Sequence, residues 1–195
     1  MNRKILGILA LGALLPVAAR AQNASTPAYS SDSFLVSVRS TWEGVRTLVI
    51  NMADSIPEDK YDWKPTPEVR SFREQLTHLA GENYLFFGRV SGESAAPAGL
   101  DDLRTKDEIM AALRASYDYG ARVFDSLTDA QAMEMVAGRG GRGPGSQRWS
   151  AILGVIQDNM DHYGNLVVYV RLNGMVPPRS AGRAGGGGRG GRGGM

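Results

Sequence analysis

The sequence predicts an all-α protein, a bundle of four helices whose connections are longer than tight turns. Three observations lead to this fold class. Apolar side chains recur at spacings of three and four along four segments of roughly 20 residues, which places them on one face of a helix. Runs with the strict alternation of a strand are absent from the sequence. Capping residues, glycine or proline mark the ends of the periodic segments.

The first 21 residues are predicted to be a secretory signal peptide. Two basic residues precede an apolar run at 5–18, which is too short to span a bilayer comfortably. Ala-Arg-Ala at 19–21 matches an A-x-A cleavage site, so cleavage is expected before Gln22. The mature protein is then expected in the periplasm or outside the cell, without a membrane attachment. An uncleaved membrane anchor is the alternative interpretation.

Composition limits the partners and the source of stability. The whole chain has a net charge of +2, but three of its 22 basic residues lie in the predicted signal peptide and four in the tail from Arg179 onward. The remaining body, with all 20 acidic residues, has a net charge of about −5. A nucleic-acid-binding domain needs a basic face, so nucleic acid is not expected as a partner. The sequence contains no cysteine, so stability must come from a packed core.

The first two helices follow a polar linker at residues 22–31. The first is predicted to end before Ile56-Pro57, and its buried stripe consists of Leu35, Val38, Trp42, Val45, Val49 and Met52. A connection that contains Trp63 leads to the second helix, which is expected from about Ser71 to Val90. The apolar face of this helix consists of Phe72, Leu76, Leu79, Phe86 and Val90.

The third helix begins after Thr105, which forms a capping box with Glu108. A short helical piece at 129–136 and an irregular Gly/Arg/Pro loop at 137–147 make the third connection the longest. The four long helices are expected to be antiparallel. The residues predicted for their shared core are Trp42, Phe72, Leu113 and Leu166.

The fourth helix is expected to have Ser150 as its N-cap and to stop at Asn173-Gly174. The bundle would then occupy residues 32–178, and the Gly/Arg-rich segment 179–195 is predicted to be a disordered tail.

The only two histidines of the chain lie on separate predicted helices, each on or beside the apolar face. Asp158 precedes His162 by four residues, so both side chains share one face of the fourth helix. Burial of an unpartnered carboxylate or imidazole is costly. From the residues alone, three kinds of partner are open to the pair: the two side chains for each other in a buried Asp–His hydrogen bond, a polar group on another helix, or a metal ion in a site completed by His78.

Three segments resemble the DinB/YfiT-like superfamily of four-helix-bundle proteins. SFREQLTHLAGENYLFF at 71–87 is similar to the second helix of that family, and DHYGNLVVYVRLNGMVPP at 161–178 to its fourth-helix signature. DWKPTPEVRSF at 62–72 resembles the connection that precedes the second helix. The resemblance implies a divalent metal, often zinc or nickel, bound by three histidines.

Carried over by position, the resemblance makes His78 and His162 metal ligands and places Asp158 where the family has its remaining histidine. Aspartate binds zinc, iron or manganese through oxygen, so the expected site consists of His78, Asp158 and His162. Zinc or nickel is the favoured ion, with iron or manganese as alternatives. Glu82, one turn after His78, is a candidate base. Asn83 and Asn165 are candidates for hydrogen bonds to the ligands.

Two function classes follow. One is an exported metal-dependent enzyme, a hydrolase or a thiol transferase acting on an unidentified small molecule. The other is a non-catalytic binding or stress-response bundle with a structural Asp–His pair and no metal. Whether the chain is an enzyme is left open, and a homodimer through a helix face is an expectation for bundles of this type.

Overall fold

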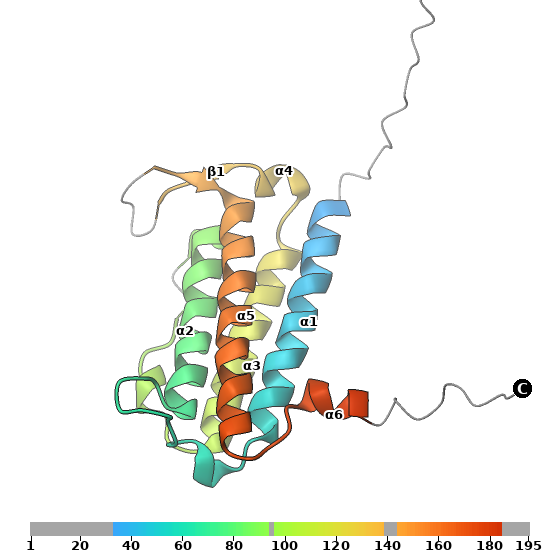
Figure 1. Cartoon of the computed structure of the whole chain (residues 1–195). Coiled ribbons are helices and arrows are strands. Elements are labelled where there is room, and N and C mark those ends of the chain that lie inside the picture. Colours follow the sequence, from blue (N-terminus) through green and yellow to red (C-terminus); the bar gives the residue numbers. More distant parts are fainter. Residues whose placement is uncertain (1–32, 94–95, 139–143, 185–195) are drawn as a thin grey trace, which may run out of the picture.

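A computed structural model describes residues 33–93, 96–138 and 144–184 of the chain. Four long helices run side by side (Figure 1): α1 (Ser33–Ser55), α2 (Phe72–Ser91), α3 (Lys106–Asp125) and α5 (Arg148–Leu172). The shorter elements are η1 (Glu58–Lys60), η2 (Leu100–Asp102), α4 (Asp129–Ala132), β1 (Met135–Val136), β2 (Ser146–Gln147) and α6 (Pro178–Ala184). The predicted all-α bundle is confirmed, while the predicted signal peptide and linker lie outside the described residues.

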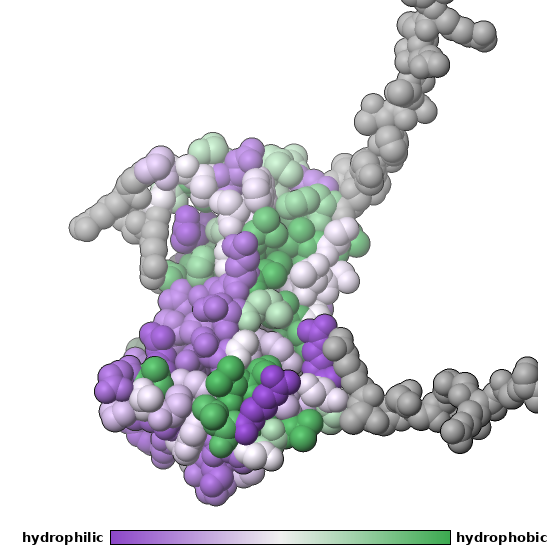
Figure 2. Space-filling model, viewed as in Figure 1, coloured by the Kyte–Doolittle hydropathy of each residue, from purple (hydrophilic) through white to green (hydrophobic). Residues whose placement is uncertain are grey.

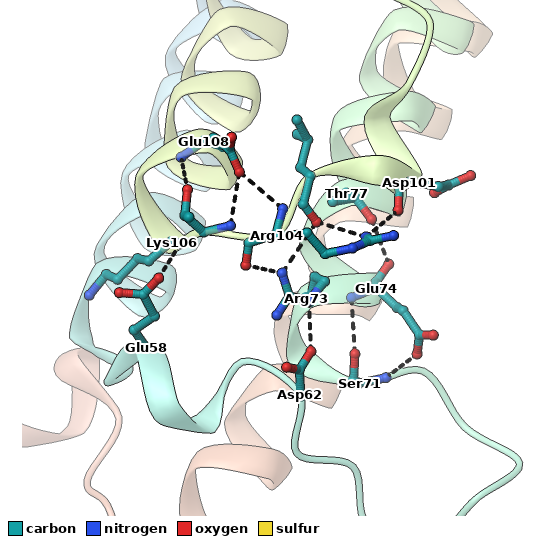
Figure 3. Close-up of polar contacts among 12 residues, drawn as sticks. Glu58, Asp62, Ser71, Arg73, Glu74, Thr77, Asp101, Arg104, Lys106 and Glu108 are labelled. Atoms are coloured by element: carbon teal, nitrogen blue, oxygen red, sulfur yellow. Dashed lines mark hydrogen bonds and ion pairs between the residues drawn. The ribbon is translucent and has the colours of Figure 1, made fainter.

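Helices α2 and α3 run in the same direction, and so do α1 and α5 (Figure 1), so the expectation of four antiparallel helices is wrong for these two pairs. Arg73, in the first turn of α2, donates hydrogen bonds to the carbonyl oxygens of Leu103 and Arg104, just before α3 (Figure 3). At the same end of the bundle, Lys106 Nζ donates to the carbonyl oxygen of Asp54 near the end of α1. The connection between α2 and α3, of which residues 92–93 and 96–105 are described, therefore begins at one end of the bundle and ends at the other, as a parallel pair of helices requires.

Side-chain caps determine where two of the long helices begin. Ser71 accepts from the backbone N–H of Glu74, whose carboxylate accepts from the N–H of Ser71. Thr105 and Glu108 make the same reciprocal pair before α3, as the sequence predicts. Helix α2 ends at Gly92, whose φ of 84° lies in the left-handed region that glycine adopts without strain.

The start of the fourth long helix differs from the prediction. Helix α5 begins at Arg148 with Gln147 as its N-cap and without a side-chain cap. Ser150, the expected cap, lies inside the helix and donates its hydroxyl to the carbonyl oxygen of Gln147. The helix begins about one turn earlier than predicted because strand β2 ends at Gln147, directly before it. Its last residue is Leu172, as predicted.

The third connection contains more regular structure than its composition indicated. Only Asp129–Ala132 of the predicted short helical piece is helical, and Thr128 caps it. Strand β1, at the end of the predicted helical piece, pairs in an antiparallel register with β2, at the end of the segment predicted to be irregular. Helix α6 (Pro178–Ala184) likewise includes residues 179–184 of the predicted disordered tail, and residues 185–195 lie outside the described part.

The core lies between all four long helices and contains each of the predicted core residues. Trp42, Phe72, Leu113 and Leu166 are fully buried. Of the two adjacent phenylalanines on α2, Phe87 rather than Phe86 is fully buried, and it packs against Trp42 and Phe124. The Phe87 ring also lies so close to Gly120 of α3 that a Cβ there would approach it to 2.5 Å, which explains a glycine inside that helix.

The outer surface is divided by polarity. In Figure 2, polar residues cover the α2 side, whereas apolar side chains gather over α5 and the neighbouring part of α1. The most exposed large apolar residues on these two helices are Val36, Val168 and Leu172. The expected homodimer stays a prediction. None of the helices in the described ranges is long and apolar enough to cross a membrane.

Candidate metal centre

Three predicted site residues meet where α2 packs against α5. His78 comes from α2, whereas Asp158 and His162 lie one turn apart on α5. The two imidazole rings meet edge to face, with centroids 5.0 Å apart and planes at 70°. Asp158 Oδ1 lies 3.8 Å from His162 Nε2. The three side chains are neighbours in space, with His162 buried and the other two half-buried.

Gln75 holds the orientation of His162. Its Oε1 atom lies 2.7 Å from His162 Nδ1, and both side chains are buried. Because the amide oxygen can only accept, the ring donates through Nδ1–H, and Nε2 keeps a free lone pair on the side of Asp158. A polar partner from another helix was one of the expected alternatives, but Gln75 was not identified as that partner from the sequence. The available signal was the position of Gln75, one turn before His78 on the same helix.

Asp158 has one oxygen that is buried and without a hydrogen-bond partner among the described residues. Burial raises the pKa of Asp158 above its ordinary value, and the negative charge of Glu82 raises it further. Glu82 is therefore close enough to add its charge to the site. The carboxyl groups of Asp158 on α5 and Glu82 on α2 would both stabilise a cation bound at this site.

Both histidines are held in the neutral form. Burial lowers the pKa of His78 and of His162 below the ordinary 6.5, and the positive charge of Arg70 lowers both further. Neutral imidazole is the form that binds a metal ion. Among the described residues, however, no group of three or more histidine, aspartate and glutamate side chains is arranged so that it could hold a metal ion as it stands.

The comparisons with known proteins agree with the fold. Residues 41–166 match the DinB superfamily. The chain belongs to the DinB superfamily. A DinB-like protein of Bacillus subtilis is 20% identical, with a TM-score of 0.60, over 72% of this chain and 93% of that one. A DinB-like protein of Bacillus cereus is 13% identical, with a TM-score of 0.64, over the same shares. No curated protein matches the chain.

Beneath the site, the DinB-family bundle contains a buried polar network that sequence reasoning did not predict. Asn159, next to Asp158, donates to Asn83 Oδ1 at 2.8 Å and accepts from the Tyr117 hydroxyl at 2.5 Å. Asn83 donates in turn to Ser116 Oγ at 3.0 Å. Asn83, a candidate for bonding to a ligand, is therefore used inside the core, where the network joins α2, α3 and α5 directly behind Asp158.

The other residues considered from the sequence lie around the rim or in the core. Tyr169 of α5 is buried, and its hydroxyl donates to the carbonyl oxygen of Arg70 at 2.9 Å. Trp63 packs edge to face on Tyr169. Trp42 lies in the core, too deep to line the site. Asn165 is exposed and makes no side-chain hydrogen bond with a described residue.

The stability of this DinB-family protein is expected to fall as the pH drops from about 7.5 to about 5. Each histidine pKa is below the ordinary 6.5 in the fold, so the unfolded chain takes up these protons first. Their contribution is present above pH 6.5 and is lost as the pH falls through the lowered values. Asp158 acts oppositely, since its raised pKa favours the fold below 3.8 and this contribution is lost as the pH rises through the raised value.

Two measurements check this pH dependence. NMR titration of the two imidazole Cε1–H signals should give both pKa values below 6.5. Urea unfolding of a His78→Gln/His162→Gln variant should show a flatter stability profile over the same pH range than the natural chain. Histidines that titrate at or above 6.5 would contradict the assigned environment.

Proposed function

We propose that this DinB-family chain is a divalent-metal-binding bundle, with His78, Asp158 and His162 as the protein ligands. One observation carries the proposal: Asp158, which lies beside His162, has a buried oxygen without a hydrogen-bond partner among the described residues, and the His78 ring packs on His162. A buried carboxylate oxygen without a partner costs free energy, and a bound cation would offset that cost. Two imidazoles and a carboxylate suit zinc, nickel, iron or manganese.

The surroundings of the ligands support this assignment. The bond from His162 Nδ1 to Gln75 is the kind of outer contact that orients metal-binding histidines. Glu82 adds negative charge near Asp158, which favours a cation. Because the three side chains do not yet surround one point, we expect metal binding to rotate at least one of them while the helices keep their places.

The chemistry of such a site is metal-assisted. A divalent ion supplies a Lewis acid that activates water or a thiol. The negative charge of Glu82 raises the pKa of Asp158, and we propose Glu82 as the general base of such a site. A hydrolase or a thiol transferase acting on a small molecule fits these parts.

The rival function is a non-catalytic bundle in which Asp158 and His162 form a structural pair. The separation of 3.8 Å between their nearest atoms is longer than a hydrogen bond, and the bond of His162 goes to Gln75 instead. The pair therefore lacks the direct contact that a purely structural role would use, and the geometry favours the metal.

Metal content and metal-dependent stability test the proposal. Protein purified without a histidine tag should contain zinc, nickel, iron or manganese, and added metal should raise its melting temperature. At a free metal concentration 100 times the dissociation constant, the native state gains about 2.7 kcal/mol. A chelator should reverse the gain. The metal site would be refuted if the purified protein contains no metal and its melting temperature changes neither with added zinc nor with a chelator.

We further propose that the protein is exported and acts in the periplasm or outside the cell. The support is the sequence of residues 1–21, with its basic start, short apolar run and A-x-A end. N-terminal sequencing of the protein from the cell exterior or periplasm should begin at Gln22. Recovery of soluble protein that retains Met1 would refute export by this route.

A further inference from the structure

Two hollows flank the candidate metal centre, and Arg70 lines both of them. The first has a volume of about 450 Å³ and reaches His78. The second, of about 580 Å³, reaches Gln75, the residue that holds His162. Arg70 thus lies at the shared border of two spaces, one lined by His78 and the other by the Gln75 side chain that contacts His162.

The backbone at Arg70 is fastened to the bundle. The buried Tyr169 of α5 donates its hydroxyl to the Arg70 carbonyl oxygen at 2.9 Å. The same ring packs edge to face against Trp63, at the other end of the connection. The N–H of Phe72 donates to the Trp63 carbonyl oxygen at 3.2 Å. These contacts hold the connection between α1 and α2 in place beside the site. The backbone of Arg70, from which its side chain extends, is therefore fixed.

The guanidinium of Arg70 has no protein partner in the part of the chain that the structure describes. It makes no hydrogen bond or ion pair there and is exposed to solvent. Four other arginines each pair with a carboxylate, namely Arg39, Arg46, Arg73 and Arg148. A guanidinium offers a planar fork of donors that matches a carboxylate, so an unpaired one beside a hollow is suited to an anionic ligand.

The charged residues around Arg70 indicate which of the two hollows is better suited to an anion. The first also contains Lys64 and three carboxylates, Glu68, Glu74 and Asp101. The second contains Glu68 as its one acidic residue, together with Asn165, whose amide can donate a hydrogen bond. An anion is therefore better accommodated in the second hollow. A single negative charge suits it better than two, because Glu68 lies on the same rim.

We propose that Arg70 and Asn165 form a carboxylate-binding subsite beside the candidate metal centre, so that its substrate is a small molecule with one carboxylate. The carboxylate lies on the guanidinium of Arg70, and the rest of the molecule extends toward His78 and His162. This inference names a substrate class and in that respect rests on the proposed function. Carboxylate binding itself is measurable on protein freed of metal by dialysis.

Butyrate and its uncharged analogue butyramide test the subsite. Each is titrated into the full chain at a fixed pH of about 8, where histidine is mostly neutral. Binding is followed through the two imidazole Cε1–H signals and the side-chain amide of Asn165. Butyrate should shift these signals saturably, whereas butyramide should not. Arg70→Gln should weaken butyrate binding by at least about tenfold, because it removes a charge-assisted bidentate contact.

Arg114→Gln is the matched control, since Arg114 is an exposed arginine on α3, makes no ion pair with a described residue and lines neither hollow. It removes the same charge and should leave butyrate binding unchanged. Equal binding of butyrate by the Arg70→Gln variant, or equal binding of butyramide by the natural chain, would overturn the subsite. If butyrate binds through Arg70 but zinc does not bind, the metal proposal fails and the carboxylate subsite stands.

Discussion

His162→Ala is expected to abolish the stabilisation by zinc. With zinc present at 100 times the dissociation constant of the natural protein, that protein should gain about 2.7 kcal/mol, whereas the variant should gain close to nothing. The physical reason is that His162 supplies the imidazole whose Nε2 faces Asp158 and whose other nitrogen is held by Gln75. The measurement is thermal or urea unfolding with and without zinc, so that the gain is compared within each variant.

The comparison within each variant matters because His162→Ala also leaves the buried Gln75 oxygen without its partner and lowers the basal stability. Asp158→Asn should also weaken zinc binding, because the substitution removes the negative charge of the ligand while it keeps the shape of the side chain. Gln157→Ala, an exposed change on the same helix, should keep the full gain. A zinc gain that survives His162→Ala would exclude His162 as a ligand.

Asn159→Ala is expected to lower the free energy of unfolding by about 2–5 kcal/mol, without depending on metal. The change leaves the Tyr117 hydroxyl without its acceptor and Asn83 Oδ1 without its donor, both in the fully buried core. Burial also raises the pKa of Tyr117, so its hydroxyl remains a donor at neutral pH. Urea unfolding with circular dichroism measures the loss.

A double-mutant cycle separates the network from simple loss of volume. Tyr117→Phe removes only the hydroxyl that donates to Asn159, so the two substitutions should be non-additive by about 0.5–3 kcal/mol. Gln157→Ala again serves as the exposed control and should change stability by no more than about 0.5 kcal/mol. Additive losses in the cycle would show that the Tyr117–Asn159 bond does not contribute to stability.

Much of the bundle was predictable because its signals are local. The spacing of Trp42 and Leu113 within their helices placed both in the core, where both are fully buried. The reciprocal caps at Thr105 and Ser71 involve residues three positions apart, and both helices begin beside them. The start of α5 was mispredicted because its position depends on the β1–β2 pairing, which a Gly/Arg-rich composition conceals.

The candidate site was predictable only as a set of residues. Asp158 and His162 share a helix face by their spacing of four, and His78 was added through the family resemblance. The contact between the two imidazoles requires α2 and α5 to pack at one particular rotation and height. The same packing decides that Asn83 turns to Asn159 in the core rather than to a ligand.

By itself, the sequence determined the four amphipathic helices, their core residues and the three candidate ligands, because helical periodicity and capping act within a few residues. Only the tertiary structure decided that α2 and α3 run parallel, that Gln75 orients His162 at a sequence separation of 87, and that Tyr169 holds the backbone of Arg70 at a separation of 99. These pairings depend on how whole helices rotate and slide against one another. Burial of many side chains at once sets that arrangement, and no local spacing encodes it.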